Sequence, residues 1–394
     1  MSDRPSTIPL SVPVMEGGEW AYVKDCLDTG WVSSGGSYVS RFESAIAELT
    51  DAKAVACQSG TAALHVALLL LGVGPGDEVI VPTVTFIATC NAVAYTGATP
   101  VFLDCDDRLG LDPAALAAFL AEECERTADG VIDRATGRTI KAIMPVHIFG
   151  VPCDMDAIAA AAEAWGLPMV EDAAESLGSS WTEGRFAGRH TGTAGALGVF
   201  SFNGNKIATC GGGGMLVTAD EALAERANHL MTTAKTDAVR FVHDEVGYNY
   251  RLTNIQAALG LAQVEGLERR VAVKRRNLET YRELLGGQPG LTVMSEPAGV
   301  RSNAWFYSLL IEPEQFGADR EHVMAALDTR GIQTRPMWLP NHLQQPYRQA
   351  RSWRIERATW YWERLLNLPC SPDLTEADVR RVCDAIREVG ELER

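Results

Sequence analysis

The sequence lacks the cysteine and histidine spacings of a metal site. Nine cysteines are spread over 394 residues, no two of them form a CxxC pair, and no cysteine-histidine cluster has zinc-binding spacing. Cys57 and Cys90 fall inside apolar segments, as buried thiols of a reducing compartment do. We therefore expect no metal ion, and we expect Cys210 to be a small core residue rather than a nucleophile.

Targeting and membrane-spanning segments are also missing. The N-terminus has no succession of basic, apolar and small residues, and the longest apolar helical stretch is too short to span a bilayer. The formal net charge of −16, from 35 basic and 51 acidic residues, disfavours nucleic acid and anionic membranes as partners. No G-x-G-x-x-G follows the first strand, which disfavours a dinucleotide-dependent dehydrogenase. We expect a cytoplasmic protein.

What the sequence does have is a regular alternation of strand-like and helix-like segments. Apolar strand segments are expected at residues 54–57, 78–81, 100–103, 141–146 and 169–172, with helices near Ile87 and over residues 113–124 and 155–165 between them. This alternation predicts an α/β fold with a mostly parallel sheet. The long helices expected at 255–266 and 267–285 introduce a different, α+β part. We predict a large domain over residues 1–260 and a small C-terminal domain over 261–394.

Lys206 is the first candidate catalytic residue. It follows the short apolar segment 196–202, which is typical of a buried strand, and burial at a strand end favours the neutral amine that condenses with a carbonyl. The four glycines 211–214 then leave no side chains between the backbone and a bound molecule. Taken alone, the lysine could be a solvated surface charge and the glycine run a flexible turn.

Asp172 closes the strand expected at 167–172 and supplies a second feature. A carboxylate beside a pyridine nitrogen keeps that nitrogen protonated and lets the ring accept electrons. Its alternative role is that of a helix cap. Because ligands of open α/β sheets bind at the carboxyl ends of strands, Lys206 and Asp172 together suggest pyridoxal phosphate (PLP).

A phosphate cradle is expected at Ser59-Gly60-Thr61, between the strand 54–57 and a strongly helical run. Free amides at a helix N-terminus, together with a hydroxyl, bind anions. A lone Ser-Gly-Thr before a helix is usually only a cap. His65, on the apolar face of that helix, is expected to be a core histidine.

Five ordered motifs carry a resemblance to a known family. They are Ser59-Gly60-Thr61, Pro82 to Thr89, Glu171-Asp172-Ala-Ala-Glu175, Ser201 to Lys206, and Gly247-Tyr-Asn249-Tyr-Arg251. In order and spacing the chain resembles the DegT/StrS sugar aminotransferases over nearly its whole length. The resemblance implies fold type I, the aspartate aminotransferase-like fold of PLP enzymes, with a mixed and mostly parallel central sheet.

The resemblance also implies roles for individual residues. Lys206 would form the imine with PLP, and Asp172 would pair with the pyridine nitrogen. Phe86 would stack on the ring, and Glu175 would lie near the ring hydroxyl. The phosphate would be bound by Gly60, Thr61, Ser201 and, from the second subunit of a homodimer with shared active sites, Asn249.

The substrate is indicated by weaker motifs. Residues 8–13, 31–38 and 334–343 resemble the LegC-type branch, which aminates a nucleotide-linked 4-keto-6-deoxy-N-acetylglucosamine for bacillosamine or legionaminic acid. Gly212, where many relatives have glutamate, fits that branch. Trp31, Ser33, Arg335 and His342 would then contact the sugar nucleotide. Because PLP and the nucleotide are anions in an acidic protein, Lys235 and Arg251 are further candidates.

The implied reaction has two halves. L-glutamate converts the cofactor into pyridoxamine phosphate, and the amine then passes to C4 of the keto sugar, with Lys206 moving the proton in both halves. Three alternatives stay open: an aminotransferase for a GDP-linked sugar, as in perosamine synthesis, one for another nucleotide-linked 4-keto sugar, and a PLP-binding regulator. A related dehydratase is disfavoured because it has histidine in place of the lysine. The nucleotide, UDP or GDP, and the C4 stereochemistry of the product stay open.

Overall fold

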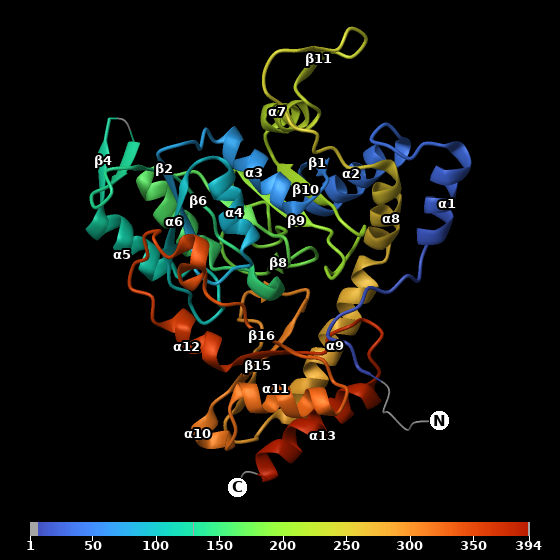
Figure 1. Cartoon of the computed structure of the whole chain (residues 1–394), viewed down its shortest axis with the longest axis vertical. Helices are drawn as coiled ribbons and strands as arrows, with labels where there is room; N and C mark the ends of the chain where they lie inside the picture. Colours follow the sequence, from blue (N-terminus) through green and yellow to red (C-terminus); the bar gives the residue numbers. More distant parts are fainter. Residues whose placement is uncertain (1–6, 129, 393–394) are drawn as a thin grey trace.

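The computed structural model describes residues 7–128 and 130–392. Figure 1 shows an upper part built around a large sheet and a lower part formed by the end of the chain. The long helix α9 (Leu267–Leu285) runs between the two parts. Within the described residues, no helix is long and apolar enough to cross a membrane.

The large sheet has the mostly parallel, mixed character that the sequence predicts. Antiparallel pairing joins β1 to β10 and β10 to β9, parallel pairing joins β9 to β7, and parallel bridges at Ile143–Met169 and Val146–Asp172 join β7 to β6. Parallel pairs of β6 with β2 and of β2 with β3 complete the sheet. The strands are β1 (Lys53–Cys57), β2 (Asp77–Pro82), β3 (Thr99–Leu103), β6 (Thr139–Ile143), β7 (Val170–Asp172), β9 (Leu197–Ser201) and β10 (Gly214–Thr218).

Among these seven strands, only β10 runs against the others. The carboxyl ends of β1, β2, β7 and β9 and the amino end of β10 therefore lie at one edge. Most residues of these strands are buried, which explains their largely apolar sequences. Residues that follow these strand ends are brought together, although they are far apart in the chain.

Helices pack against the strands of this sheet. Asp112, Asp154 and Asp220 cap α5, α6 and α7 through their side-chain oxygens, so local sequence sets where these helices begin. A short hairpin of β4 (Cys124–Thr127) and β5 (Gly130–Asp133) extends the sheet beside β6. The helices are α1 (Glu19–Thr29), α2 (Ser37–Thr50), α3 (Gly60–Leu70), α4 (Ala88–Tyr95), α5 (Pro113–Glu123), α6 (Met155–Trp165), α7 (Glu221–Met231) and α8 (Asn254–Glu265).

The C-terminal part has its own antiparallel sheet in the order β13-β15-β17-β16 and its own buried core. Its strands are β13 (Leu291–Val293), β15 (Tyr307–Ile311), β16 (Arg335–Pro336) and β17 (Leu365–Leu368), and its helices are α10 (Pro313–Phe316), α11 (Arg320–Thr329), α12 (Arg357–Arg364) and α13 (Glu376–Leu392). Ile8 packs into this core and forms a bridge with Ile332, so the beginning of the described chain lies against the C-terminal part.

Several local expectations differ from the structure. Sequence patterns did not predict β10, α7, α12, β17 or a small hairpin of β11 (Lys235–Asp237) with β12 (Val242–His243). The expected domain boundary at 260 falls inside α8. We propose Gly266, between α8 and α9, as the boundary, because it leaves both helices whole.

Candidate active site

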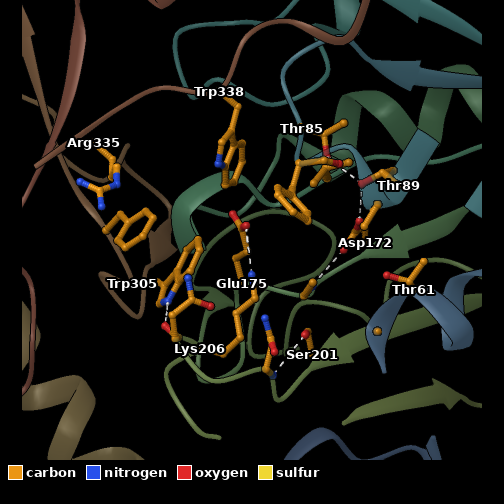
Figure 2. A pocket seen from close by; sticks show the side chains of 18 of the residues that line it. Thr61, Thr85, Thr89, Asp172, Glu175, Ser201, Lys206, Trp305, Arg335 and Trp338 are labelled. Atoms are coloured by element: carbon orange, nitrogen blue, oxygen red, sulfur yellow. Dashed lines mark hydrogen bonds and ion pairs between the residues drawn. The ribbon is translucent and has the colours of Figure 1, made fainter. Parts of the chain in front are cut away.

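A cavity of about 780 Å³ opens at the sheet edge where the strand ends meet. Its volume lies in the range of small-molecule sites. The residues around it come from both parts of the chain, and Figure 2 shows many of their side chains pointing into one space. Of the residues predicted from sequence, the cavity brings together Gly60, Thr61, Phe86, Asp172, Glu175, Ser201, Lys206 and Arg335.

Lys206 and Glu175 form an ion pair inside this cavity. The Lys206 Nζ lies 3.2 Å from Glu175 Oε1, and only 11% of the lysine side chain and 4% of the glutamate side chain are exposed. Glu175 Oε2 also accepts a hydrogen bond of 2.8 Å from the amide of Phe149. Burial raises the pKa of Glu175, and the charge of Lys206 opposes that rise. An amine held in this way has little access to water and a carboxylate beside it that can exchange its proton.

Asp172 is buried at the end of β7 beneath two threonines. Thr89 donates a 2.7 Å hydrogen bond to Asp172 Oδ2, Thr85 lies 2.7 Å from Thr89, and the amide of Ala174 donates to Oδ1. Burial raises the pKa of Asp172, whereas the bond from Thr89 is the largest opposing influence. No ion pair to Asp172 occurs among the residues described, so a cation in the cavity would be its natural partner.

The turn between β1 and α3 forms an anion cradle. Ser59 caps α3 by accepting a hydrogen bond from the amide of Ala62, which leaves the amides of Gly60 and Thr61 ahead of the first intrahelical bond. A Cβ on Gly60 would lie 3.0 Å from Ser201, and one on Gly214 would lie 2.4 Å from the Ser59 carbonyl carbon. Both glycines are therefore needed for the close approach of β9, β10 and the helix N-terminus.

Aromatic side chains form the wall opposite the cradle. Phe86 lines the cavity, is 53% exposed, and packs against Trp338 with ring centroids 5.8 Å apart. Trp305 lies with its ring centroid 4.0 Å from Lys206 Nζ. Sequence reasoning missed Trp305 and Trp338, although the aromatic run at residues 305–307 was a visible signal.

The polar groups around this cavity fit PLP. A buried carboxylate suits a pyridinium nitrogen, the N-terminus of α3 suits a phosphate, and the ion-paired Lys206 suits an aldehyde. When it is bound, PLP supplies an electron-accepting ring that stabilises negative charge on a substrate carbon. The chain itself supplies the carboxylates, the amine and the apolar walls.

Three predicted site residues lie outside this cavity within the single chain. Asn249 forms a bridge with Thr232, and Lys235 belongs to the β11–β12 hairpin, which projects from the molecule in Figure 1. Arg251 pairs with Glu43, with 3.2 Å between Nη2 and Oε2, and forms an antiparallel backbone bridge with Cys57. Their proposed contacts with cofactor or substrate stay predictions.

Trp31, Ser33 and His342 also do not line the cavity. The carbonyls of Trp31 and Ser33 accept hydrogen bonds from Asn254, and the Trp31 ring is 62% exposed. His342 Nδ1 lies 2.7 Å from Thr83 Oγ1, and burial lowers its pKa. Arg335 is thus the one member of the predicted substrate set that this chain places in the cavity.

The residues that we expected to be structural are buried. His65 is 5% exposed and lies among tyrosine rings. Cys210 is 3% exposed, and burial raises the pKa of its thiol to about 12, so it is a core residue as predicted. His229, Asp244 and Glu245 could offer three ligand atoms at the surface, but Arg226 already pairs with Glu245.

Comparison with known proteins agrees with this geometry. Residues 13–387 match the model of the DegT/DnrJ/EryC1/StrS aminotransferase family. The GDP-perosamine synthase of Caulobacter vibrioides is 40% identical over 392 residues, covering 99% of this chain and 100% of that protein. The GDP-perosamine synthase of Escherichia coli O157:H7 is 37% identical, covering 97% and 98%. DesI, solved with its TDP-sugar product, is 30% identical, with a TM-score of 0.84 over 99% of this chain and 94% of DesI.

A cavity of this design on a fold type I scaffold defines a PLP-dependent transferase. The chain belongs to the DegT/DnrJ/EryC1/StrS aminotransferase family, and it is a PLP-dependent sugar aminotransferase of nucleotide-sugar biosynthesis. The sequence motifs favour the LegC-type branch, whereas the two curated relatives described above are both GDP-perosamine synthases.

Proposed function

We propose that this enzyme transfers the amino group of L-glutamate to C4 of GDP-4-keto-6-deoxymannose. The identity of 40% with the GDP-perosamine synthase of Caulobacter vibrioides, along the full length of both chains, is the observation that carries the proposal. The cavity is large enough for a sugar and part of its nucleotide beside the cofactor. The identity with this synthase supports the GDP-linked alternative over the N-acetylated UDP-sugar.

The residues of the cavity divide the work in this proposal. Lys206 accepts a proton from the α carbon of glutamate and returns one to C4 of the sugar. Glu175 Oε1 lies 3.2 Å from Lys206 Nζ and holds the lysine amine in place for these proton transfers. Thr89 and the Ala174 amide donate to Asp172 and favour its ionised form, which would pair with the pyridinium nitrogen of bound PLP.

The anionic groups of both substrates need cations that the acidic chain provides sparingly. Lys206 and Arg335 are the cationic side chains around the cavity, and Lys206 is paired with Glu175. The guanidinium of Arg335 donates to the carbonyl of Thr334 and makes no ion pair within the described chain. We assign Arg335 to a substrate carboxylate or phosphate.

A second copy of the chain completes the site in this proposal. The helix N-terminus, Thr61 and Ser201 offer amides and hydroxyls to the phosphate but no charged side chain. Asn249 lies outside the cavity of its own chain, in the segment that follows the projecting hairpin. We propose a homodimer in which Asn249 of each copy reaches the phosphate of the other.

A UDP-linked 4-keto-6-deoxy-N-acetylglucosamine is the second candidate substrate. The resemblance of residues 8–13, 31–38 and 334–343 to the LegC-type branch favours it, and Arg335 from the last segment faces the cavity. The two candidates differ in the nucleotide and in the group at C2 of the sugar.

Assay of the pyridoxamine phosphate form of the enzyme against both 4-keto sugars separates the candidates. We expect single-turnover conversion of the GDP-linked sugar and a return of the PLP absorbance. Conversion of only the N-acetylated UDP-sugar would replace the first candidate by the second. Failure with all 4-keto nucleotide sugars, in enzyme that still reacts with glutamate, would refute both.

A further inference from the structure

Trp305 connects the C-terminal part of the chain to the turn that carries Lys206. It lies between β14 (Val300–Arg301) and β15, whereas Lys206 follows β9 of the large sheet. Its side chain is almost completely buried, at 2% exposure. Figure 2 shows its indole beside Lys206 at the wall of the cavity.

The indole N–H fixes the backbone beside the lysine. Trp305 Nε1 donates a 2.8 Å hydrogen bond to the carbonyl oxygen of Asn205, the residue before Lys206. The Lys206 amide in turn donates to the carbonyl of Asn203 at 3.0 Å, so the turn is held from two sides. A partly buried carbonyl that loses its donor costs free energy, so the N–H of Trp305 restricts the path of this turn.

The indole face restricts the lysine side chain. The Nζ of Lys206 lies 4.0 Å from the ring centroid, within cation–π range, and Glu175 lies 3.2 Å from the same nitrogen. Phe306 stacks on Trp305 with centroids 4.0 Å apart and an interplanar angle of 18°. The ring is therefore packed in place and confines the amine to the space beside Glu175.

Trp305 is itself held by a buried amide. Asn303 Oδ1 accepts a 2.9 Å hydrogen bond from the amide of Trp305, and Asn303 Nδ2 donates to the carbonyls of Glu175 and Leu177. A Cβ on Gly150 would lie 1.9 Å from Asn303 Oδ1, so this amide occupies space that only glycine leaves free. The same segment thus positions both Trp305 and the backbone of Glu175.

We infer that Trp305 is a positioning residue for Lys206, holding its turn through Asn205 and confining its amine beside Glu175 during proton transfer. This inference rests on the proposed function for the identity of the amino donor. Its effect on the Lys206 turn does not depend on the substrate. Trp305 acts through Lys206 and is not itself a proton donor or acceptor.

Two substitutions separate the contributions of the N–H and the ring. Trp305→Phe keeps an aromatic face and removes the donor, and Trp305→Leu removes both. Trp338→Leu is the matched control, because Trp338 lines the same cavity but contacts Phe86 and Phe149 rather than Lys206. Trp353→Leu, at a half-buried tryptophan packed on Phe119 outside the cavity, controls for the loss of indole packing contacts.

Hydrogen exchange of the cofactor-free protein tests the turn directly. We expect the amide of Lys206 to exchange about three- to tenfold faster in both Trp305 variants, from the loss of the part-buried hydrogen bond to the Asn205 carbonyl. The two control variants should leave that amide unchanged. Unchanged exchange in both Trp305 variants, with a thermal melt showing folded protein, would overturn the role in holding the turn.

Single-turnover reaction of the PLP-loaded enzyme with glutamate tests the proton transfer. Trp305→Leu should lower the rate constant by about tenfold or more, from lost positioning, and α-deuterated glutamate should then show a primary isotope effect. The apparent glutamate dissociation constant should change less than twofold. A weaker glutamate affinity at an unchanged rate, or a slower rate without the isotope effect, would overturn the inference. Wild-type enzyme that does not react with glutamate would instead refute the proposed amino donor.

Discussion

The hydrogen bond from Thr89 to Asp172 should control the acid limit of activity. Asp172 is 4% exposed, and burial raises its pKa, so its ionised form depends on the donors that reach it. The side-chain donor is Thr89, at 2.7 Å from Oδ2. Thr89→Val replaces the hydroxyl by a methyl group of nearly the same size and removes this donor without removing bulk.

The size of the effect follows from the burial of the pair. A hydrogen bond to a charged group contributes about 1.5–3 kcal/mol, and no solvent discount applies because Thr89 is 1% exposed. The ratio of ionised to protonated Asp172 should therefore fall about ten- to a hundredfold at a given pH. Because the pKa of Asp172 rises further in the variant, the acid limb of its pH profile should move to higher pH. At pH values above the acid limbs of both enzymes, the rate should change less.

The assay is kcat/KM for the sugar substrate between pH 5 and pH 9. Thr96→Val is the matched control, since Thr96 is a buried threonine at the end of the same helix and donates to the carbonyl of Val93. The control should lower stability without moving the acid limb. An acid limb at the wild-type position in folded Thr89→Val enzyme would refute the argument that this hydroxyl keeps Asp172 ionised.

Three further predictions test other parts of the site and the core. Lys206→Ala should prevent covalent attachment of PLP, so borohydride treatment should label that peptide in the wild type and not in the variant, as mass spectrometry would show. Gly214→Ala should lower PLP affinity at least about tenfold, because its Cβ would lie 2.4 Å from the Ser59 carbonyl carbon in the phosphate cradle. Gly74→Ala, with nothing within 4 Å of its Cβ, should leave PLP affinity unchanged. Equal PLP affinity of the two variants in a spectral titration would contradict the role of this turn in binding phosphate. Burial lowers the pKa of His190 to about 4, so between about pH 6.5 and pH 4 the folded state binds fewer protons than the unfolded chain, and stability falls as the pH falls. His190→Gln should therefore remove about 2 kcal/mol of the loss in unfolding free energy between pH 7.5 and pH 5, measured by urea titration. An identical pH dependence of stability in the variant would refute this.

The core of the site could be predicted because its signals are local. Lys206 and the Ser59-Gly60-Thr61 turn each follow a short apolar strand, Asp172 is the last residue of another strand, and parallel strands place their carboxyl ends at one edge. The direction of β10 could not be inferred in this way, because an antiparallel strand within a mostly parallel sheet is decided by pairing with distant strands.

The cationic candidates show where sequence reasoning ends. Arg251 and Arg335 both lie within segments that resemble the family, yet Arg251 pairs with Glu43 and Arg335 faces the cavity. Nothing in the residues next to either arginine distinguishes them. The difference depends on which carboxylate the fold brings within reach, and Glu43 lies 208 residues from Arg251 in the chain.

The sequence by itself determined the chemistry of this enzyme, since a lysine, a carboxylate and a helix N-terminus at strand ends suit one cofactor. The tertiary structure decided how that chemistry is held. Thr89 lies 83 residues from Asp172, and Trp305 lies 100 residues from Asn205, so neither pairing leaves a local pattern. Contacts of that kind arise only when separate elements pack, because burial brings each donor to the acceptor that would otherwise lose its hydrogen bond to water.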